Sequence, residues 1–355
     1  MNRTQQVARL RIAYQRELAL GTERFQAAKR TVCPWCGSSR LRTRLRTVDL
    51  LQHKPGTFVI DQCRDCSHSF QNPQLTPEGL DFYYRDFYDG LGAAQAEWVF
   101  GAQGSRKRYL AGARALLPFG TPRRWLDVGT GYGHFPQTAR TVLPATVFDG
   151  LDLGEGVEEA RNQGRIAEAY QGLLTELAPK LEARYDAVSM FHYLEHSTDP
   201  RAELTAARTV LAPGGHLIIE VPDPECVMSR ILGRWWTGYF QPQHQHLIPL
   251  ANLRRELESL GCAVVAVGRR EPHIRAELTG AAALALGHFL PPADDPWRAR
   301  PPSRLQRTAR EALFWSAVPL IAGVYGLDQL LAPLLSRTRF SNAYRIVARS
   351  GAAPR

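Results

Sequence analysis

RWLDVGTGYGHF, Arg124–Phe135, is the stretch that decides the fold. A short apolar run containing Asp127 leads into Gly129, Gly131 and Gly133, and a segment compatible with a helix follows. This order predicts a buried strand, a glycine loop that can approach a ligand closely, and a helix. The third glycine comes one place earlier than in the dinucleotide pattern, and an acid here suits a cationic ligand better than a pyrophosphate. The alternative is an ordinary strand and helix whose glycines serve only packing.

Length and composition describe a globular chain. Its 355 residues, 44% of them apolar, can form one large domain with attachments, or two domains. The net charge is +10, and arginines crowd at 3–30, 40–46 and 298–310, where they suit solvated faces or anionic partners. The first thirty residues lack the apolar core of a signal peptide. We therefore expect a cytoplasmic protein whose six cysteines are ligands or free thiols, not disulfides.

Two C-x-x-C pairs separated by 26 residues predict a structural zinc site. The four cysteines are Cys33, Cys36, Cys63 and Cys66. The segment between the pairs is rich in strand-forming residues and breaks at 54–56, which indicates a β-hairpin. His53 and His68 lie close enough in sequence to compete as ligands, and a redox pair or unrelated buried thiols are the alternatives. A filled four-cysteine site has no open position for catalysis, so this zinc would be architectural.

From residue 121 onward, strands and helices alternate regularly. We expect strands at 125–128, 145–153, 166–170, 185–191, 217–222, 262–267 and 343–349, and helices at 134–143, 157–162 and 253–260. Residues 211–215 are expected to stop a helix and turn into the fifth strand. Asp152 ends the second strand, 19 residues past Gly133, where a carboxylate can accept both ribose hydroxyls of a nucleoside. Ligands of such sheets lie beyond the carboxyl ends of the strands, so residues 191–196 should line the site.

Four of these segments, in order, resemble the motifs of class I S-adenosylmethionine (SAM) methyltransferases. They are the glycine loop, the acid at the tip of the second strand, FHYLEHSTDP at 191–200 and LAPGGHLIIEVP at 211–222. The resemblance covers 121–272 and 343–350. A short zinc ribbon followed by an Asn-Pro and tyrosine segment also resembles the region preceding the catalytic domain in a group of bacterial small-molecule methyltransferases.

The resemblance implies a Rossmann-like α/β fold with a doubly wound, mostly parallel seven-stranded sheet, a small N-terminal zinc ribbon and a helical insertion before the last strand. The expected parts are an N-terminal helix at 1–30, the ribbon at 31–72, an aromatic-rich helical connector at 73–120, the SAM-binding core at 121–272, the insertion at 273–341, and the closing strand and tail at 342–355. The aromatic cluster at 82–88 either attaches the ribbon to the core or caps the site.

The insertion contains two apolar stretches, 281–290 and 312–327. The second, with its internal Pro319, is shorter than the roughly 20 residues that span a bilayer. An odd number of membrane crossings before the closing strand would also place that strand on the opposite side of the membrane from its sheet. We therefore expect no transmembrane span. The insertion covers an apolar substrate, makes peripheral membrane contact through 281–335, or only packs.

The resemblance also implies roles for individual residues. The expected SAM-binding residues are Asp127, Gly129, Gly131, Gly133, Asp152, Leu153, Gly172, Leu173, Phe191 and His192. The acid that relatives often place near Gly172 for adenine is missing here. The candidate catalytic residues are His192, His196, His244 and His246, because histidine suits a general base near neutral pH. His196 is favoured for positioning or proton transfer and His244 for acceptor contact, while a purely structural role for His196 is the alternative.

The most plausible function is methylation of a small-molecule acceptor, apolar, sugar-like or lipid-like, at oxygen or carbon. RNA methylation would use the basic zinc ribbon, but the Asn/Asp-Pro-Pro-Tyr/Phe motif is absent and basic residues are not interleaved with stacking aromatics. A nonenzymatic SAM-binding or scaffold protein is the third hypothesis. A dehydrogenase fails on the glycine spacing and on Asp127. The oligomeric state is not predicted.

Overall fold

The computed structural model describes residues 3–87, 102–269, 276–292, 294–335 and 338–351. A seven-stranded sheet in the order β10-β11-β8-β7-β4-β5-β6 forms its centre. The strands are β4 (Arg124–Val128), β5 (Val147–Asp152), β6 (Ala169–Gln171), β7 (Tyr185–Phe191), β8 (Leu211–Pro222), β10 (Cys262–Gly268) and β11 (Ala343–Ser350). All neighbouring pairs are parallel except those of β11, which is antiparallel to β8 and β10. This confirms the predicted Rossmann-like fold class.

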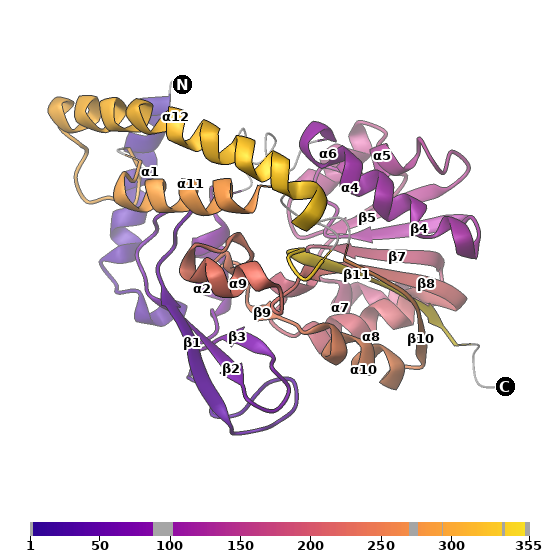
Figure 1. The fold of residues 1–355 in the computed structure, drawn as a ribbon. Coiled ribbons are helices and arrows are strands. Elements are labelled where there is room, and N and C mark those ends of the chain that lie inside the picture. Colours follow the sequence, from indigo (N-terminus) through magenta and orange to yellow (C-terminus); the bar gives the residue numbers. More distant parts are fainter. Residues whose placement is uncertain (1–2, 88–101, 270–275, 293, 336–337, 352–355) are drawn as a thin grey trace.

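Helices cover both faces of the sheet (Figure 1). On one side lie α4 (Ala102–Arg114), α5 (His134–Ala139) and α6 (Gly156–Asn162), and on the other lie α7 (Leu174–Leu177), α8 (Pro200–Val210) and α10 (Leu250–Ser259). The buried strands are apolar on both faces because both are covered. Trp125 is fully buried, and its Nε1–H donates to Ser189 Oγ at 2.9 Å, which ties β4 to β7.

The N-terminal ribbon forms a second sheet of four strands, β1 (Leu41–Thr47), β2 (Phe58–Cys63), β3 (Ser69–Gln71) and β9 (His246–Leu247). The antiparallel pairing of β1 with β2 is the predicted hairpin. β9 was not predicted: it comes from the chain after β8 and pairs with β3, so the core contributes a strand to the ribbon sheet.

The aromatic connector packs beside this sheet. Phe82 and Tyr83, on α2 (Pro77–Tyr84), are buried against Phe25 and against Tyr14 of α1 (Arg3–Leu18). Short helices connect the larger elements: η1 (Glu23–Phe25), η2 (Leu117–Phe119), η3 (Ala178–Lys180), η4 (Leu194–His196), α9 (Val227–Ile231), η5 (Gly233–Trp235) and η6 (Thr237–Tyr239). Residues 88–101 of the expected connector lie outside the described residues, and its last part, 102–120, contains α4, which packs with α5 on the central sheet.

The fifth strand of the core is longer than expected. β8 begins at Leu211 instead of residue 217, and its pairing with β7 shifts register after Tyr185. The predicted Pro-Gly-Gly turn is therefore an irregularity within the strand. Gly215 is required there, since a Cβ would lie 2.9 Å from the carbonyl oxygen of Ala212.

The insertion forms an antiparallel hairpin of α11 (Glu277–Phe289) and α12 (Arg304–Leu335), which extends from the sheet to beyond α1 (Figure 1). α12 continues past Asp328 because that side chain is buried, accepting hydrogen bonds from Leu278 N at 3.2 Å and Thr279 N at 2.7 Å. Among the described helices, α12 alone is long and apolar enough to cross a membrane. The expectation that this segment is too short was therefore wrong, whereas the topological argument against a span still applies.

Candidate functional site

The glycine loop joins β4 to α5 at the carboxyl edge of the sheet. Gly129 has φ +76°, and a Cβ there would lie 2.8 Å from Tyr193 Cδ2. Gly131 has φ +51°, but a Cβ there would meet no atom within 4 Å. The loop is thus packed on one side and open on the other, so a ligand can approach the backbone at Gly131. Gly133 ends the loop with φ +73°.

Asp152 connects the loop to the tip of β5. Its Oδ2 accepts from Gly131 N and its Oδ1 from Gly154 N, both at 2.8 Å. Burial raises the pKa of Asp152 despite these hydrogen bonds. Each carboxylate oxygen has a second lone pair, which can accept from hydroxyl donors of a ligand.

Asp127 is buried beneath the loop. Ser189 Oγ donates to its Oδ1 at 2.5 Å, and burial raises the pKa of this carboxyl to about 7. A cation beside Asp127 would offset the desolvation of its ionised form. The two carboxyls and the open glycine backbone therefore fit a ligand that carries an ammonium group and vicinal hydroxyls, as SAM does.

Three other predicted cofactor residues lie along the same edge. Leu153, 62% exposed, follows β5, and Gly172 and Leu173 follow β6. Gly172 N donates to Asp152 O at 3.0 Å, so the two strand tips are held together.

The exit of β7 holds a buried chain of hydrogen bonds around His192. Its Nδ1 lies 3.0 Å from Glu195 Oε1, and its Nε2 lies 3.1 Å from Glu220 Oε1. Glu220 also pairs with Arg345, whose Nη2 is 2.6 Å from Oε2. Burial lowers the pKa of His192 and raises that of Glu195 to about 8. A protonated Glu195 would then donate to Nδ1, and Nε2–H would donate to Glu220.

His196 and His244 lie next to Glu195, with ring centroids 4.6 Å apart. His244 Nδ1–H donates to the carbonyl oxygen of Gly238 at 2.8 Å, which leaves its Nε2 as the lone-pair nitrogen. His196 Nδ1 lies 2.7 Å from the hydroxyl of Tyr84. Since that hydroxyl donates to a backbone carbonyl at 3.2 Å, it accepts from Nδ1–H, and Nε2 again carries the lone pair.

Burial lowers the pKa of His196 to about 4 and lowers that of His244 well below its usual value, so both rings are neutral. Glu195 Oε2 is buried and accepts no hydrogen bond within the described chain. His244 Nε2 is 4.0 Å from Glu195 Oε1, whereas two ligands of one metal ion lie about 3 Å apart. As arranged, the cluster is better suited to accept a proton or a polar substrate group than to coordinate an ion.

The structure separates His246 from the other three candidate histidines. It lies on β9, where its Nδ1 is 3.0 Å from His68 Nε2 and its ring stacks on that of His68. This pair joins the ribbon to the core. The Nε2 atom of His68 is thus engaged by His246, and His53 lies beside Gly287 of α11. Neither histidine belongs to the group formed by the four cysteines.

Several residues of the candidate site were not singled out from the sequence. They are Tyr84, Glu195, Glu220 and Arg345. Glu195 is the middle residue of the LEH motif, so its position in the motif could have indicated it. Tyr84 and Arg345 reach the site from 112 positions before His196 and 125 positions after Glu220, and no local pattern indicates such contacts.

The four cysteines converge as predicted. Cys33 Sγ is 3.7 Å from Cys66 Sγ, and Cys36 Sγ is 3.6 Å from Cys63 Sγ. These separations are too long for disulfides and match the edge of about 3.8 Å that a tetrahedral zinc site with 2.3 Å bonds requires. Backbone N–H groups of Trp35 and Asp65 also point at Cys33 and Cys63 at 3.4 Å. The cluster is compatible with zinc.

Comparison with known proteins finds similarity to methyltransferases. Residues 102–267 match the family model of a methyltransferase domain. The ubiquinone biosynthesis O-methyltransferase of Aeromonas salmonicida is 30% identical over 154 residues, covering 40% of this chain and 63% of that protein. The same enzyme of Alkalilimnicola ehrlichii is 30% identical over 132 residues, covering 35% and 52%. The chain thus spans between about half and two thirds of these relatives.

Solved structures with related folds include a SAM-dependent methyltransferase from Archaeoglobus fulgidus, with TM-score 0.46, 20% identity, and coverage of 73% of this chain and 99% of that one. Magnesium protoporphyrin IX methyltransferase from Synechocystis has TM-score 0.46 and 14% identity, covering 76% and 99%.

The raised pKa of Glu195 predicts a distinctive pH dependence of stability. Glu195 binds a proton in the folded state up to about pH 8, whereas the unfolded chain releases it near pH 4.5. The stabilisation is complete below pH 4.5 and is lost as the pH rises through 8. Between pH 6.5 and 8 the wild type should lose up to about 1 kcal/mol of unfolding free energy per pH unit relative to Glu195→Gln. Denaturant unfolding at several pH values measures this.

The exposed Glu258→Gln serves as the matched control and should follow the wild type. Parallel pH profiles for wild type and Glu195→Gln would contradict the assignment of the proton to Glu195.

Proposed function

We propose that this chain, a class I SAM-dependent methyltransferase by its domain and its fold, transfers a methyl group to an apolar small-molecule acceptor at oxygen or carbon. The observation that carries the proposal is the position of two neighbouring groups at one edge of the sheet. One is the open glycine loop with Asp127 and Asp152, and the other is the buried cluster of Glu195, His196 and His244.

The first group would hold the cofactor. Asp127 would pair with the ammonium of the methionine moiety, and the backbone of Gly129, Gly131 and Gly133 would pass alongside it. Asp152 would accept from the ribose hydroxyls. Leu153, Gly172 and Leu173 would contact the adenine, and Phe191 and His192 would flank the sulfonium. When bound, SAM supplies an already activated methyl group, so the protein mainly has to orient the acceptor.

The second group would handle the acceptor. Neutral His196 presents Nε2 as a base, and the hydroxyl of Tyr84 holds its tautomer. As an acceptor oxygen or carbon bonds to the methyl group, the proton that it loses would move to this nitrogen. His244 and Phe240, with ring centroids 4.9 Å apart, would line the acceptor side. We give His246 no catalytic role, since it pairs with His68.

The cofactor assignment predicts that substitution of either Asp152 or Asp127 lowers the affinity for SAM. Asp152→Ala should weaken SAM binding about tenfold, because the ribose loses its acceptor, whereas Glu155→Ala, exposed at the next turn, should not.

The affinity of the wild type for SAM should rise from pH 6 to pH 8 as Asp127 ionises. The Asp127→Asn variant should bind SAM weakly, with an affinity that does not change with pH. Titration calorimetry at both pH values measures this. Unchanged affinity of both Asp variants would rule out this site.

The zinc proposal predicts about one zinc ion per chain by elemental analysis. Cys63→Ser should lose the metal and lower the melting temperature, because metal binding contributes to the folding free energy of the ribbon. Cys262→Ala, outside the cluster, should retain the metal. Zinc-free wild-type protein, prepared without chelators, would show that the cluster has another role.

Labelled SAM incubated with metabolite extracts tests the activity directly. Label should appear in apolar products by mass spectrometry. His196→Ala should reduce the rate about 100-fold or more while SAM affinity is kept, and His216→Ala, on the other edge of the sheet, should leave the rate unchanged. Label in RNA would favour the RNA alternative. SAM binding without any transfer would favour a nonenzymatic protein.

A further inference from the structure

The outer surface of α12 is apolar to an unusual degree. Trp315, Leu320 and Leu330 are 68%, 70% and 77% exposed, and only 6% of the most apolar 18-residue window of the helix is buried. Phe289 at the end of α11 is also 74% exposed. Contiguous apolar surface of this kind marks contact with another apolar phase.

The one charge within this surface is turned inward. Asp328 is the only charged residue between Glu311 and Arg337. Its carboxylate accepts from the first turn of α11, including Thr279 Oγ1 at 2.6 Å. This contact locks the two helices together and leaves no charge on the outer faces of α12 between those two positions.

Both ends of the hairpin are tied to the folded body. Before α12, Trp297 packs edge-on against Tyr14 of α1 at 5.5 Å, and its carbonyl accepts from Gln15 Nε2 at 2.9 Å. After α12, the chain returns to β11 inside the central sheet. A helix held at both ends against the same body lies along a surface and does not cross it.

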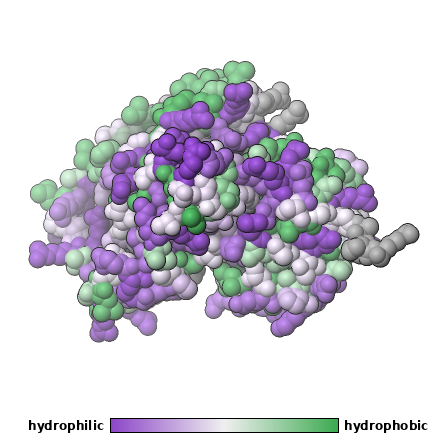
Figure 2. All heavy atoms as spheres, turned by 90° about the horizontal axis from the view of Figure 1, so that it is seen from below, coloured by the Kyte–Doolittle hydropathy of each residue, from purple (hydrophilic) through white to green (hydrophobic). Residues whose placement is uncertain are grey.

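The exposed side chains surround much of the helix. Leu313, Leu320, Leu327 and Leu334 repeat every seven residues on one stripe, and Trp315 projects about 160° away from it. A single partner helix would cover one stripe only, whereas fluid hydrocarbon and the interface above it can cover both. The face turned away from α12 is different: Figure 2 shows polar and apolar side chains interspersed there.

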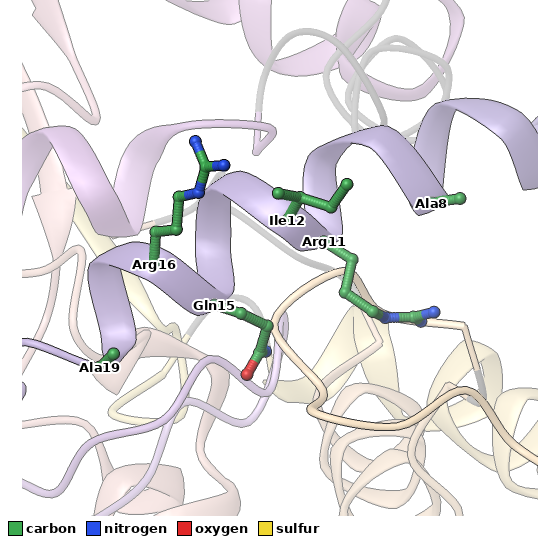
Figure 3. A pocket seen from close by; sticks show the side chains of 6 residues that line it. All are labelled: Ala8, Arg11, Ile12, Gln15, Arg16 and Ala19. Carbon is green, nitrogen blue, oxygen red and sulfur yellow. The ribbon is translucent and has the colours of Figure 1, made fainter.

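Positive charge borders the apolar surface at the start of α12. Residues 294–310 hold five arginines against two aspartates, a net charge of +3. α1 lies against this segment, with Arg11 Nη2 3.2 Å from the carbonyl oxygen of Asp295. Figure 3 shows the shallow hollow on this part of α1, where Ile12 and Arg16 stand outward and Arg11 extends toward the neighbouring loop. A basic border on an apolar helix suits anionic lipid headgroups.

We propose that the α11–α12 hairpin docks the protein flat onto an anionic lipid bilayer, with the apolar faces of α12 among the acyl chains and the arginines at the headgroups. The docked hairpin would stand next to the acceptor side of the proposed active site through α11. α11 contacts η5 and η6, where Trp235 meets His288 at 5.6 Å, and the chain continues from η6 to Phe240 and His244. This second point rests on the proposed function and implies an acceptor that resides in the membrane.

Vesicle flotation of the full chain tests the proposal with two kinds of vesicle. One contains phosphatidylcholine alone, and the other contains phosphatidylcholine with about 30% of the anionic lipid phosphatidylglycerol. The protein should float with the anionic vesicles, less with the neutral ones, and less at high salt. The triple variant Trp315→Ser, Leu320→Ser, Leu330→Ser should bind at least about tenfold more weakly. A matched control, Leu117→Ser, Val147→Ser, Val265→Ser, replaces three exposed apolar residues outside the hairpin and should bind like the wild type.

Circular dichroism and SAM calorimetry confirm that each variant folds, and they separate this proposal from the methyltransferase proposal, which does not depend on vesicles. Flotation that is equal for both triple variants would overturn the docking surface. Absence of flotation would also overturn it. In that case sedimentation would test self-association: if the wild type is a dimer and the hairpin substitutions convert it to a monomer, a second copy of the chain is the occupant.

Discussion

Burial of carboxyl groups at one edge of the central sheet is the constraint on which the site depends. Glu220 is compensated by Arg345 and His192, and it fixes the loop after β7. Among the described residues, no Lys or Arg forms an ion pair with Asp127 or Glu195, and burial raises the pKa of both carboxyl groups. Such groups lower stability unless they bind a proton or a ligand. The folded chain thus favours a cation beside Asp127 and keeps a proton near Glu195.

The ribbon is part of the same arrangement and not a separate appendage. β9 joins its sheet, His68 contacts His246, and Gln74 Nε2 donates to the carbonyl oxygen of Thr198 at 2.8 Å, close to His196. α2 then brings Tyr84 to the imidazole of His196. If zinc orders the ribbon, the metal would act on the proposed acceptor side indirectly, by fixing the elements that contact His196.

Local patterns predicted the elements that local physics determines. The strand and glycine loop at 124–135, the cysteine spacing and the alternation of the core predicted the fold class and the hairpin, and they indicated the sheet edge where the candidate site lies. β9 is two residues long, and the Glu220–Arg345 pair joins residues 125 positions apart, so neither leaves a periodic signal. The length of α12 was underestimated because the apolar stretch was ended at residue 327, before Asp328, whereas the amide groups of α11 bind that carboxylate and the helix continues.

The position of β11 has a consequence for synthesis. This strand lies between β8 and β10, yet it is made last, after the whole hairpin. Until it emerges from the ribosome, the facing edges of β8 and β10 have no strand between them, and the apolar hairpin is already exposed. Nascent chains with open strand edges and apolar helices are prone to aggregate. Early capture of the hairpin, by a chaperone or a lipid surface, would protect the chain until the sheet closes.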